Sequence, residues 1–566
     1  MGVFRLASAV AAVPAGGLAS LIHRLATGPE AILEIDVGLI ADLRGRQQWI
    51  HQIRRAAADP LVAAVLFRFH APIGGWAACQ DLREAILALR RAGRPVYAVL
   101  EAPGNALTWL ASAADRVFMI PTGELGLVGV GIEMTFFGEA LSRLGVRPDF
   151  EAAGAYKSFG EPFTRSFPSP ENHEAVRALV DDLHEQLIEG IAEARSQTPD
   201  AIRALLERAP LSASEALEAG LIDQLAYPDQ ITDWIQERHG SRSRRLAFRQ
   251  WALRDRIREW IGRWGAPSTS VGVLHLQGPV VVEEAPRGPS IAARKVGPIL
   301  RALREDDDVG AVVLHINSPG GSALASDLIW REVDELSKIK PVVASFEDTA
   351  ASGGYYIAAP AAEILVRPGT LTGSIGVFGG KLVLAEGLRR VGVHSREVLG
   401  APNANLFSAA HHFSEPQRVR FRRSLQRFYD GFVQRVADGR GKEEAIIEPH
   451  CRGRVWTGRA ALQRELADRS GALDDAVDRA RSLAGLSEGQ FVRKDLSAYQ
   501  VPLAARLTQA MMRRHAPAAL ADLGLLGSAL RLAQRALPGA SGVLAELILT
   551  HPEQPLAVLP FELEPR

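Results

Sequence analysis

The sequence predicts an α/β fold built from two copies of one architecture. Matching residues recur at a fixed offset: Gly145 and Gly392 are 247 positions apart, and the same separation joins Pro121 to Pro368. Short apolar, β-branched runs such as "AAVLFRF" and "GAVVLHI" alternate with helical patterns in each copy. Such runs are typical of buried parallel strands, and strand–helix–strand units imply right-handed crossovers. A chain of 566 residues is long enough for several domains of this kind.

The repeat and the changes in composition along the chain predict five segments. The two copies are expected to be joined by the Arg- and Trp-rich bridge "RQWALRDRIREWIGRWG". The last segment is expected to be an amphipathic helical tail that covers a neighbouring surface. The segments are residues 1–28, a membrane anchor or interfacial helix; 29–245, the N-terminal copy; 246–269, a linker helix; 270–490, the C-terminal copy; and 491–566, a helical C-terminal extension.

The N-terminus contains an uncharged stretch, "LASAVAAVPAGGLASLI", which runs from Leu6 to Ile22. This length is at the short limit for a membrane span, and the stretch is rich in Ala and Gly with a proline inside. Three interpretations stay open: a weak membrane anchor, an interfacial or groove-packed helix, and a cleaved signal.

Charge and cysteine content restrict the classes of function. Lys plus Arg and Asp plus Glu number 65 each, so no overall field draws the chain to nucleic acid or excludes it. The two cysteines, Cys79 and Cys451, are far apart in the sequence and lack the spacing of metal ligands. A zinc site or a disulfide framework is therefore not expected.

The stretch "HINSPGGSALASD" places Gly320 and Gly321 directly after a predicted strand and before a predicted helix. Two glycines at such a point let backbone N–H groups approach a ligand and face a developing negative charge. The glycine pattern matches neither a dinucleotide-binding fingerprint nor a phosphate-binding loop. A tight turn between strand and helix would explain the same residues without any function.

Ser352 lies in "EDTAASGGYYIAA", after a predicted strand and at the start of a predicted helix. The positive end of the helix dipole favours an alkoxide or an oxyanion there, and the N–H of Gly353 is free to donate to one. Gly320 or Gly321 would offer the second donor. The alternative is that Ser352 only caps the helix, since serine is among the best capping residues.

A serine nucleophile needs a base, and the histidines are poorly placed to supply one. His315 falls inside a predicted strand, whereas His411 and His412 fall in a polar, helix-like segment. Ser374, in "TLTGSIGVFGG", is a rival nucleophile, but its setting among glycines favours a structural role.

Lys157, in "AGAYKSFGEPF", is the candidate base. At the offset of 247, Ser352 falls on Asn105 and Lys157 falls on Ala404, so each copy carries the group that the other lacks. A lysine among aromatic residues is expected to be desolvated, which lowers its pKa because burial disfavours the charged form. A solvated lysine in a surface loop is the alternative.

Several motifs together resemble the signal peptide peptidase A family, also called protease IV, in its long, duplicated bacterial form. They are "NSPGGS", "ASGGYYIAAPA", "TLTGSIGVFGG", "AYKSFGEPF", "RFYDGFVQRVADGRG" and "GRVWTGRAAL", and the resemblance covers about residues 30 to 485. It implies tandem crotonase/Clp-protease-like domains and a serine–lysine dyad assembled across the two copies. Ser352 would be the nucleophile, Lys157 the general base, and Gly353 with Gly320 or Gly321 the oxyanion hole.

The resemblance also implies the biological setting. It predicts hydrolysis of signal-peptide remnants and other hydrophobic peptides, without metal, cofactor or nucleic acid, by a homotetramer. The expected location is the bacterial inner membrane, with the catalytic domain facing the periplasm. Two other functions stay open: a catalytically silent scaffold that binds peptides, and a crotonase-type acyl-CoA enzyme. The latter would need an acidic catalytic group such as Glu347 or Asp348.

Overall fold

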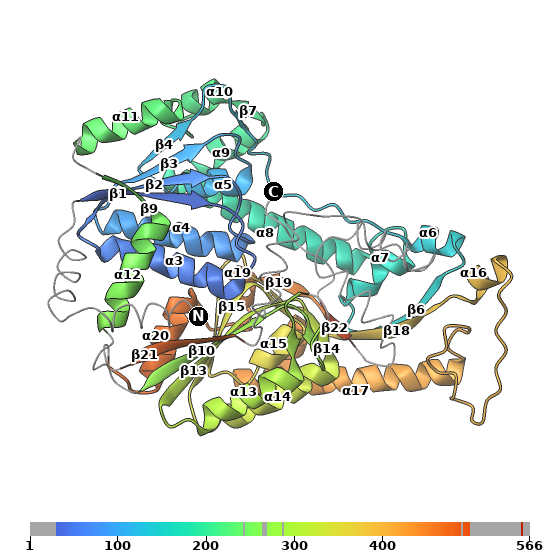
Figure 1. Cartoon of the computed structure of the whole chain (residues 1–566). Coiled ribbons are helices and arrows are strands. Elements are labelled where there is room, and N and C mark those ends of the chain that lie inside the picture. The colour runs from blue at the N-terminus through green and yellow to red at the C-terminus, as the bar shows by residue number, and fades with distance from the viewer. Residues whose placement is uncertain are drawn as a thin grey trace. The chain divides into compact units, whose positions relative to one another are not determined.

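The computed structural model describes residues 30–240, 244–262, 269–285, 288–487, 491–497 and 556–558 (Figure 1). Contacts within the chain divide it into two compact units. Unit 1 contains the described residues up to Val130 and those from His184 to Gly262; unit 2 contains residues 131–183 and those from Thr269 onward. Part of the predicted N-terminal copy is therefore in the same unit as the C-terminal copy.

Unit 1 is built around a six-stranded parallel sheet in the order β8–β4–β3–β2–β1–β9. Its strands are short apolar runs because helices cover both faces. Helix α11 packs on one face, where Ile231 and Ile235 join Leu66, Val99 and Phe118 in one apolar cluster, and α3 and α4 lie on the other (Figure 1). Its elements are β1 (Ala31–Val37), α3 (Leu43–Ala58), β2 (Val62–Phe69), α4 (Trp76–Arg91), β3 (Val96–Leu100), α5 (Asn105–Ala111), β4 (Arg116–Met119), β5 (Glu124–Leu125), α9 (Pro199–Leu206), β7 (Leu211–Ser212), α10 (Ala213–Glu218), β8 (Gln224–Leu225), α11 (Pro228–His239), β9 (Arg244–Ala247) and α12 (Phe248–Gly262).

Unit 2 contains a larger sheet whose parallel strands run in the order β21–β10–β13–β15–β17, with β19 antiparallel at the end. Strand β15 also pairs with β16, which pairs with β20. The elements of this sheet and the helices around it are β10 (Ser270–Gln277), α13 (Ala293–Glu305), β13 (Val309–Ser318), α14 (Ala323–Ser337), β15 (Val342–Ala351), α15 (Gly353–Ala358), β16 (Glu363–Val366), β17 (Leu371–Gly373), α17 (Glu415–Arg440), α18 (Glu444–Ile447), η2 (Glu448–His450), β19 (Val455–Thr457), α19 (Gly458–Gln463), β20 (Arg469–Ser470), α20 (Leu473–Leu483) and β21 (Val492–Ser497).

A second sheet of unit 2 has the strand order β12–β11–β14–β22–β18–β6. Strands β6 and β18 form an antiparallel ribbon that joins residues 147–153 to residues 377–383. This sheet therefore brings the segment from Gly131 to Leu183 onto the body of unit 2. Its elements and their neighbours are α6 (Gly138–Arg143), β6 (Arg147–Ala153), η1 (Ser158–Gly160), α7 (Glu161–Thr164), α8 (Pro170–Ala194, which continues into unit 1), β11 (Val280–Val281), β12 (Ile291–Ala292), β14 (Gly320–Ser322), β18 (Val377–Val383), α16 (Ala385–Arg390) and β22 (Leu556–Val558).

Helices cover both faces of the larger sheet in unit 2. On one face, α13, α14, α15 and α17 bury a large apolar cluster that includes Leu314, Ile329, Tyr356 and Phe432. On the other face, α20 packs Ala476 and its neighbours against strand residues such as Val273. Burial on both faces explains why these strands are continuous apolar runs in the sequence.

The element bounds of the two units recur at the offset predicted from the sequence. Strand β4 begins at Arg116 and β16 begins at Glu363, a separation equal to that of Gly145 and Gly392. Helices α4 and α14 begin at Trp76 and Ala323, which are separated by the same offset. The order strand, helix, strand, short helix, strand recurs in both units, with the short strand β14 added before α14 in unit 2. The expected α/β architecture of alternating helices and parallel strands is confirmed.

The two chain ends can be compared with expectation only in part. The stretch from Leu6 to Ile22 and most of the predicted helical extension, residues 498–555, lie outside the described residues. The parts of that extension that are described, β21 and β22, are strands. Among the described helices, none has the length and apolar character needed to cross a membrane.

Candidate active site

Ser352 occupies a strained turn between β15 and α15. Its backbone has φ 53° and ψ −114°, a region that residues other than glycine rarely adopt. The N–H of Ser352 donates to the carbonyl of Gly373 at 2.8 Å, which holds the turn against β17. The side chain is fully buried. Strain of this kind persists only where the surrounding structure enforces it.

The side chain of Ser352 does not cap α15, although the residue stands at the capping position. Within the described residues of this helix, no N–H group of the first turn donates to its hydroxyl. An ordinary capping serine has extended backbone angles and bonds the second or third N–H of its helix. The alternative that Ser352 only caps the helix is therefore wrong, and its hydroxyl has a different partner.

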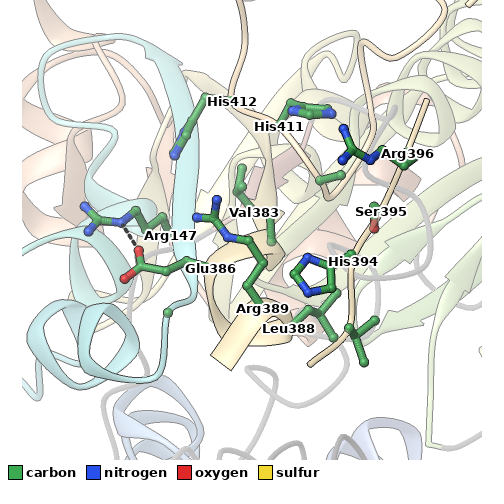
Figure 2. A pocket seen from close by; sticks show the side chains of 14 residues that line it. Arg147, Val383, Glu386, Leu388, Arg389, His394, Ser395, Arg396, His411 and His412 are labelled. Carbon is green, nitrogen blue, oxygen red and sulfur yellow. Dashed lines mark hydrogen bonds and ion pairs between the residues drawn. The ribbon is translucent and has the colours of Figure 1, made fainter. Parts of the chain in front are cut away.

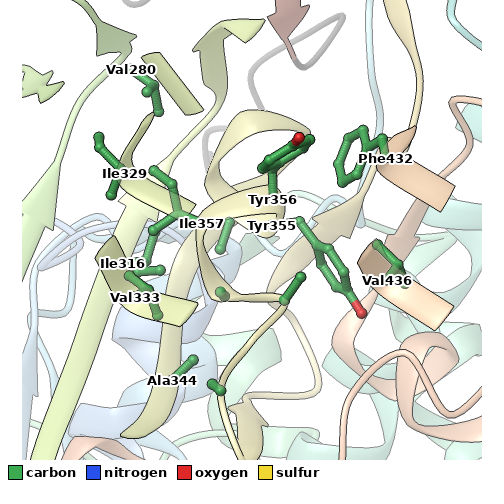
Figure 3. Close-up of a cluster of buried hydrophobic side chains, with 14 of the residues drawn as sticks. Val280, Ile316, Ile329, Val333, Ala344, Tyr355, Tyr356, Ile357, Phe432 and Val436 are labelled. Carbon is green, nitrogen blue, oxygen red and sulfur yellow. The ribbon is translucent and has the colours of Figure 1, made fainter. Parts of the chain in front are cut away.

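Two buried tyrosines fix the helix that follows Ser352. Tyr355 donates from its hydroxyl to the carbonyl of Leu466 at 2.7 Å, and Tyr356 donates to the carboxylate of Asp327 at 2.8 Å. Figure 3 shows both rings inside the apolar cluster, with Tyr356 beside Phe432 and Tyr355 beside Val436. Because each ring is held by packing and by one hydrogen bond, the start of α15 has little freedom to move.

Lys157 reaches the same place from the ribbon of β6 and β18. The register pairs Ala153 with Val377, so the loop that follows β6 lies beside the loop that precedes β18. The N–H of Tyr156 donates to the carbonyl of Arg452 at 2.8 Å. A Cβ atom on Gly453 would lie 2.6 Å from the backbone nitrogen of Lys157, so this close approach requires glycine.

The amine of Lys157 contacts two serines. Its Nζ lies 2.7 Å from Ser352 Oγ, and it lies 3.0 Å from both the carbonyl oxygen and the Oγ of Ser374. A neutral amine has two N–H donors and one lone pair. If the two donors bind the oxygens of Ser374, the lone pair is left for the hydroxyl proton of Ser352. The geometry therefore suits removal of that proton by the amine.

Burial lowers the pKa of Lys157 well below its ordinary value. Only 5% of the residue is exposed, and Phe159, two positions further along the chain, packs against Phe378 with ring centroids 4.6 Å apart. Within the described part of the chain, no carboxylate is among the partners of the amine, so nothing there offsets the cost of burying the charge. Burial therefore shifts Lys157 toward its neutral form, which is the direction that the sequence suggested and that a general base requires.

The three predicted oxyanion glycines lie next to the serine. A Cβ atom on Gly353 would lie 3.2 Å from the backbone nitrogen of Gly321 and 3.3 Å from the Cα atom of Gly320. The N–H of Gly353, in the first turn of α15, has no acceptor inside its own helix. The N–H of Gly320 donates to Ser318 Oγ at 3.1 Å. Gly353 and Gly321 are thus the better placed of the three to bind an oxyanion.

The other residues considered from the sequence are placed elsewhere. His315 lies in β13 as expected, with its Nδ1 3.0 Å from Nδ1 of His275. The expectation of a helix-like segment around His411 and His412 is wrong, because these residues lie in the irregular chain between α16 and α17. Glu347, considered for a crotonase-type reaction, accepts a hydrogen bond from Asn317 Nδ2 at 3.1 Å.

A polar cavity of about 690 Å³ lies at the other end of the β6–β18 ribbon. Figure 2 shows Arg147 and Glu386 paired at its edge, with Arg389 and His394 beside them. The register pairs Arg147 with Val383 there, whereas the end near Lys157 is six residues away, about 20 Å along the strands. This cavity is not part of the Ser352–Lys157 site.

The role of Ser374 was not predicted from the sequence. Ser374 has φ 51° and is fully buried, and its N–H donates to the carbonyl of Arg454 at 2.7 Å. This conformation turns both its carbonyl and its hydroxyl to the amine of Lys157. The one available signal was a serine between glycines in "TGSIG", which by itself indicates only a turn.

Comparison with known families gives one match that covers more than half of the chain. The model of the family described as "Peptidase family S49" matches residues 88–242 and again residues 334–487. The chain belongs to peptidase family S49. The two matched regions lie one in each predicted copy, and the second contains Ser352 whereas the first contains Lys157.

Curated relatives of this S49 chain carry protease names. It is 29% identical to "Serine protease SPPA, chloroplastic" from Arabidopsis thaliana over 76% of this chain and 64% of that protein. It is 28% identical to "Protease 4" from Haemophilus influenzae over 78% of this chain and 74% of that protein. The chain thus spans about two thirds of the length of these relatives.

Among solved structures, the S49 chain aligns with a mutant of ClpP1 from Listeria monocytogenes. The alignment covers 36% of this chain and 94% of that one, at 14% identity and a TM-score of 0.25. At this score the likeness adds nothing to the description of the fold.

Proposed function

We propose that the protein is a serine endopeptidase in which Ser352 is the nucleophile and Lys157 the general base. The observation that carries this proposal is the 2.7 Å separation of Lys157 Nζ and Ser352 Oγ. The two groups come from segments that are far apart in the sequence. Membership of family S49 and the protease names of the relatives support the same reaction class.

The reaction follows from the chemistry of these groups. Neutral Lys157 accepts the hydroxyl proton of Ser352 while Oγ attacks the carbonyl carbon of the scissile peptide bond. The carbonyl oxygen becomes an oxyanion, and the N–H groups of Gly353 and Gly321 are placed to donate to it. Protonated Lys157 then gives the proton to the leaving amine, and the C–N bond breaks to leave an acyl-enzyme.

Release of the acyl group repeats the sequence with water. Lys157, neutral again, accepts a proton from a water molecule, whose oxygen attacks the ester carbon. The C–O bond to Ser352 breaks, Lys157 returns the proton to Oγ, and the carboxylic acid leaves. Ser374 keeps the amine in place through both halves of the reaction, since its two oxygens bind the amine N–H groups that do not take part.

The biological setting belongs to the same proposal and rests on the family resemblance. We place the two copies as tandem Clp-protease-like repeats, with hydrophobic peptides such as signal-peptide remnants as substrates. Assembly as a homotetramer and residence at the bacterial inner membrane, facing the periplasm, complete the proposal. The recurrence of element bounds at one fixed offset supports the tandem repeat.

The proposal is tested by hydrolysis of an apolar fluorogenic peptide by the full chain. We expect Ser352→Ala and Lys157→Ala each to lower kcat by about a thousandfold or more while circular dichroism stays unchanged. The matched control is Asn105→Ala, which changes the equivalent position of unit 1 and should leave kcat as it was. Undiminished hydrolysis by the Lys157→Ala protein would reject the dyad.

A further inference from the structure

The bridging loop, residues 452–454 between η2 and β19, holds the segment that carries Lys157. The carbonyl of Arg452 accepts a hydrogen bond from the N–H of Tyr156 at 2.8 Å. The backbone of Gly453 packs directly on the backbone of Lys157, at a distance that only a residue without Cβ allows. The position of the amine therefore depends on the position of the bridging loop.

The same loop also holds the segment that carries Ser374. The N–H of Gly453 donates to the carbonyl of Ile375 at 2.7 Å. The N–H of Ser374 donates to the carbonyl of Arg454, also at 2.7 Å. Consecutive residues of one loop thus bond the segment of the base and the segment of the serine that orients the amine. A shift of the bridging loop would change the distances from Lys157 Nζ to its partners.

Arg452 holds a backbone conformation that residues other than glycine rarely adopt. Its φ is 51°, and such a conformation persists only where neighbouring groups enforce it. The guanidinium binds the carboxylate of Glu448, through Nε at 3.0 Å and through Nη2 at 2.7 Å. The two side chains are 49% and 33% exposed, and an ion pair at the surface contributes little to stability. The ion pair alone is therefore a weak restraint on the loop.

Tyr429 of α17 supplies a restraint on the backbone itself. Its ring is buried, and its hydroxyl accepts a hydrogen bond from the N–H of Arg452 at 3.2 Å. The same hydroxyl donates to Oε1 of Glu448 at 3.3 Å. Burial raises the pKa of Tyr429, so the hydroxyl keeps the proton that it donates. A backbone N–H that loses its acceptor away from water is costly, so this hydroxyl favours the observed position of the loop.

We infer that Tyr429 is a positioning residue for the general base and acts by holding the bridging loop at the N–H of Arg452. The inference rests on the proposed function for the role of Lys157 as the base. The effect of Tyr429 reaches the amine through two hydrogen bonds, which join Tyr429 to Arg452 and Arg452 to Tyr156. Loss of the hydroxyl should loosen the loop and let water reach the amine. The pKa of Lys157 should then rise toward the ordinary lysine value, because burial is what lowers it.

The first test is Tyr429→Phe in the full chain, which keeps the ring and removes only the hydroxyl. The matched control is Tyr97→Phe in unit 1, which removes a hydroxyl that lies 2.8 Å from Nε2 of His239. We expect Tyr429→Phe to lower kcat for an apolar fluorogenic peptide by at least about fivefold, with little change in KM. The rise of kcat/KM should also move to higher pH. The control should keep the wild-type kcat and pH profile. A wild-type kcat and pH profile in Tyr429→Phe would overturn the inference.

A second test separates the conformation of the bridging loop from its ion pair. Arg452→Gly and Arg452→Ala both remove the guanidinium that binds Glu448, but only glycine adopts a positive φ without strain. We expect kcat of the Arg452→Gly protein to be several-fold higher than kcat of the Arg452→Ala protein. Equal kcat values in these two proteins would contradict a role for the loop conformation.

The pKa of Lys157 can also be measured without hydrolysis. NMR of protein labelled with carbon-13 at the lysine Cε atoms follows the chemical shift of Lys157 as the pH changes, and its signal is assigned by its loss in Lys157→Ala. A higher pKa in Tyr429→Phe than in the wild type supports the inference, whereas equal pKa values would overturn it. Because this titration needs no cleavage, a failure of the proposed peptidase activity would be seen separately.

Discussion

The start of α5 in unit 1 and the start of α15 in unit 2 are equivalent places that differ in what their buried side chains do. In unit 1, Asn105 binds the backbone of Gly129 twice, through Nδ2 to the carbonyl at 2.9 Å and through Oδ1 from the N–H at 3.0 Å. In unit 2, the hydroxyl of Ser352 accepts no hydrogen bond from the described N–H groups of its own helix. It contacts the amine of Lys157 instead. One side chain closes a loop, whereas the other faces a base.

Backbone conformation separates the two places as clearly as the side chains do. Ser352 has φ 53°, whereas Asn105 is not among the described residues with positive φ and simply begins its helix. The partner groups differ as well: Lys157 and Ser374 of unit 2 correspond by the offset to Ala404 and Leu127, neither of which could hold a proton. The comparison shows that unit 2 combines a strained backbone with a buried amine, whereas unit 1 has hydrogen-bonded loop closure at the equivalent place.

The largest expected effect concerns pH, because the comparison assigns activity to a neutral amine. Burial lowers the pKa of Lys157, and protonated Lys157 cannot accept the proton of Ser352. Activity is therefore lost as pH falls through that pKa and reaches a plateau above it. We expect kcat/KM to rise with a slope of one and to level off well below pH ~10.4, the ordinary lysine value. A pH profile that begins to rise only near pH ~10 would show that the amine is not desolvated.

A smaller effect is expected from Ser374→Ala, which removes one of the two acceptors that orient the amine of Lys157. One hydrogen bond contributes about 1 kcal/mol, so kcat should fall by about fivefold with little change in KM. The matched control is Thr372→Val in the same segment, whose hydroxyl donates to the carbonyl of Ala350 at 2.7 Å rather than to the dyad. That change should lower the thermal stability and leave kcat unaltered. Equal losses of kcat in both variants would contradict a specific role for Ser374.

The smallest expected effect is on stability and has opposite signs in the two units. At position 352, glycine adopts a positive φ without strain. The free energy of unfolding of the Ser352→Gly protein should therefore be about 1 kcal/mol higher than that of the Ser352→Ala protein. At position 105 the backbone is unstrained. The free energy of unfolding of the Asn105→Gly protein should therefore be roughly 0.5 kcal/mol lower than that of the Asn105→Ala protein. Urea unfolding of the four proteins measures both differences. If the difference between the glycine and alanine variants had the same sign at both positions, backbone strain at Ser352 would be contradicted.

Much of the architecture could be predicted because the chain repeats. The fixed offset, read from glycines and prolines, placed strands such as β2 and β13 at matching positions. The same offset showed that Ser352 and Lys157 lack counterparts, which suggested them as a pair. Periodicity of this kind survives in the sequence because buried strands need apolar residues and turns need glycine or proline.

The features that could not be predicted depend on contacts that produce no periodic pattern in the sequence. The orientation of Ser374 follows from a positive φ and from the approach of the Gly453 loop to Lys157. The placement of β22 depends on the pairing of a short segment with strands that are distant in the sequence. The sequence also did not indicate that residues 131–183 join the unit that contains Ser352. Long-range pairing of short segments is decided by backbone groups that every residue carries, so composition cannot indicate it.

Covalent labelling tests the central claim most directly. The wild-type protein is treated with a serine-directed phosphonate, and the modified peptide is mapped by mass spectrometry. The account predicts modification at Ser352 alone, and a labelling rate that falls by about a hundredfold or more in the Lys157→Ala protein. Modification at Ser374, or labelling of the Lys157→Ala protein at the wild-type rate, would contradict it.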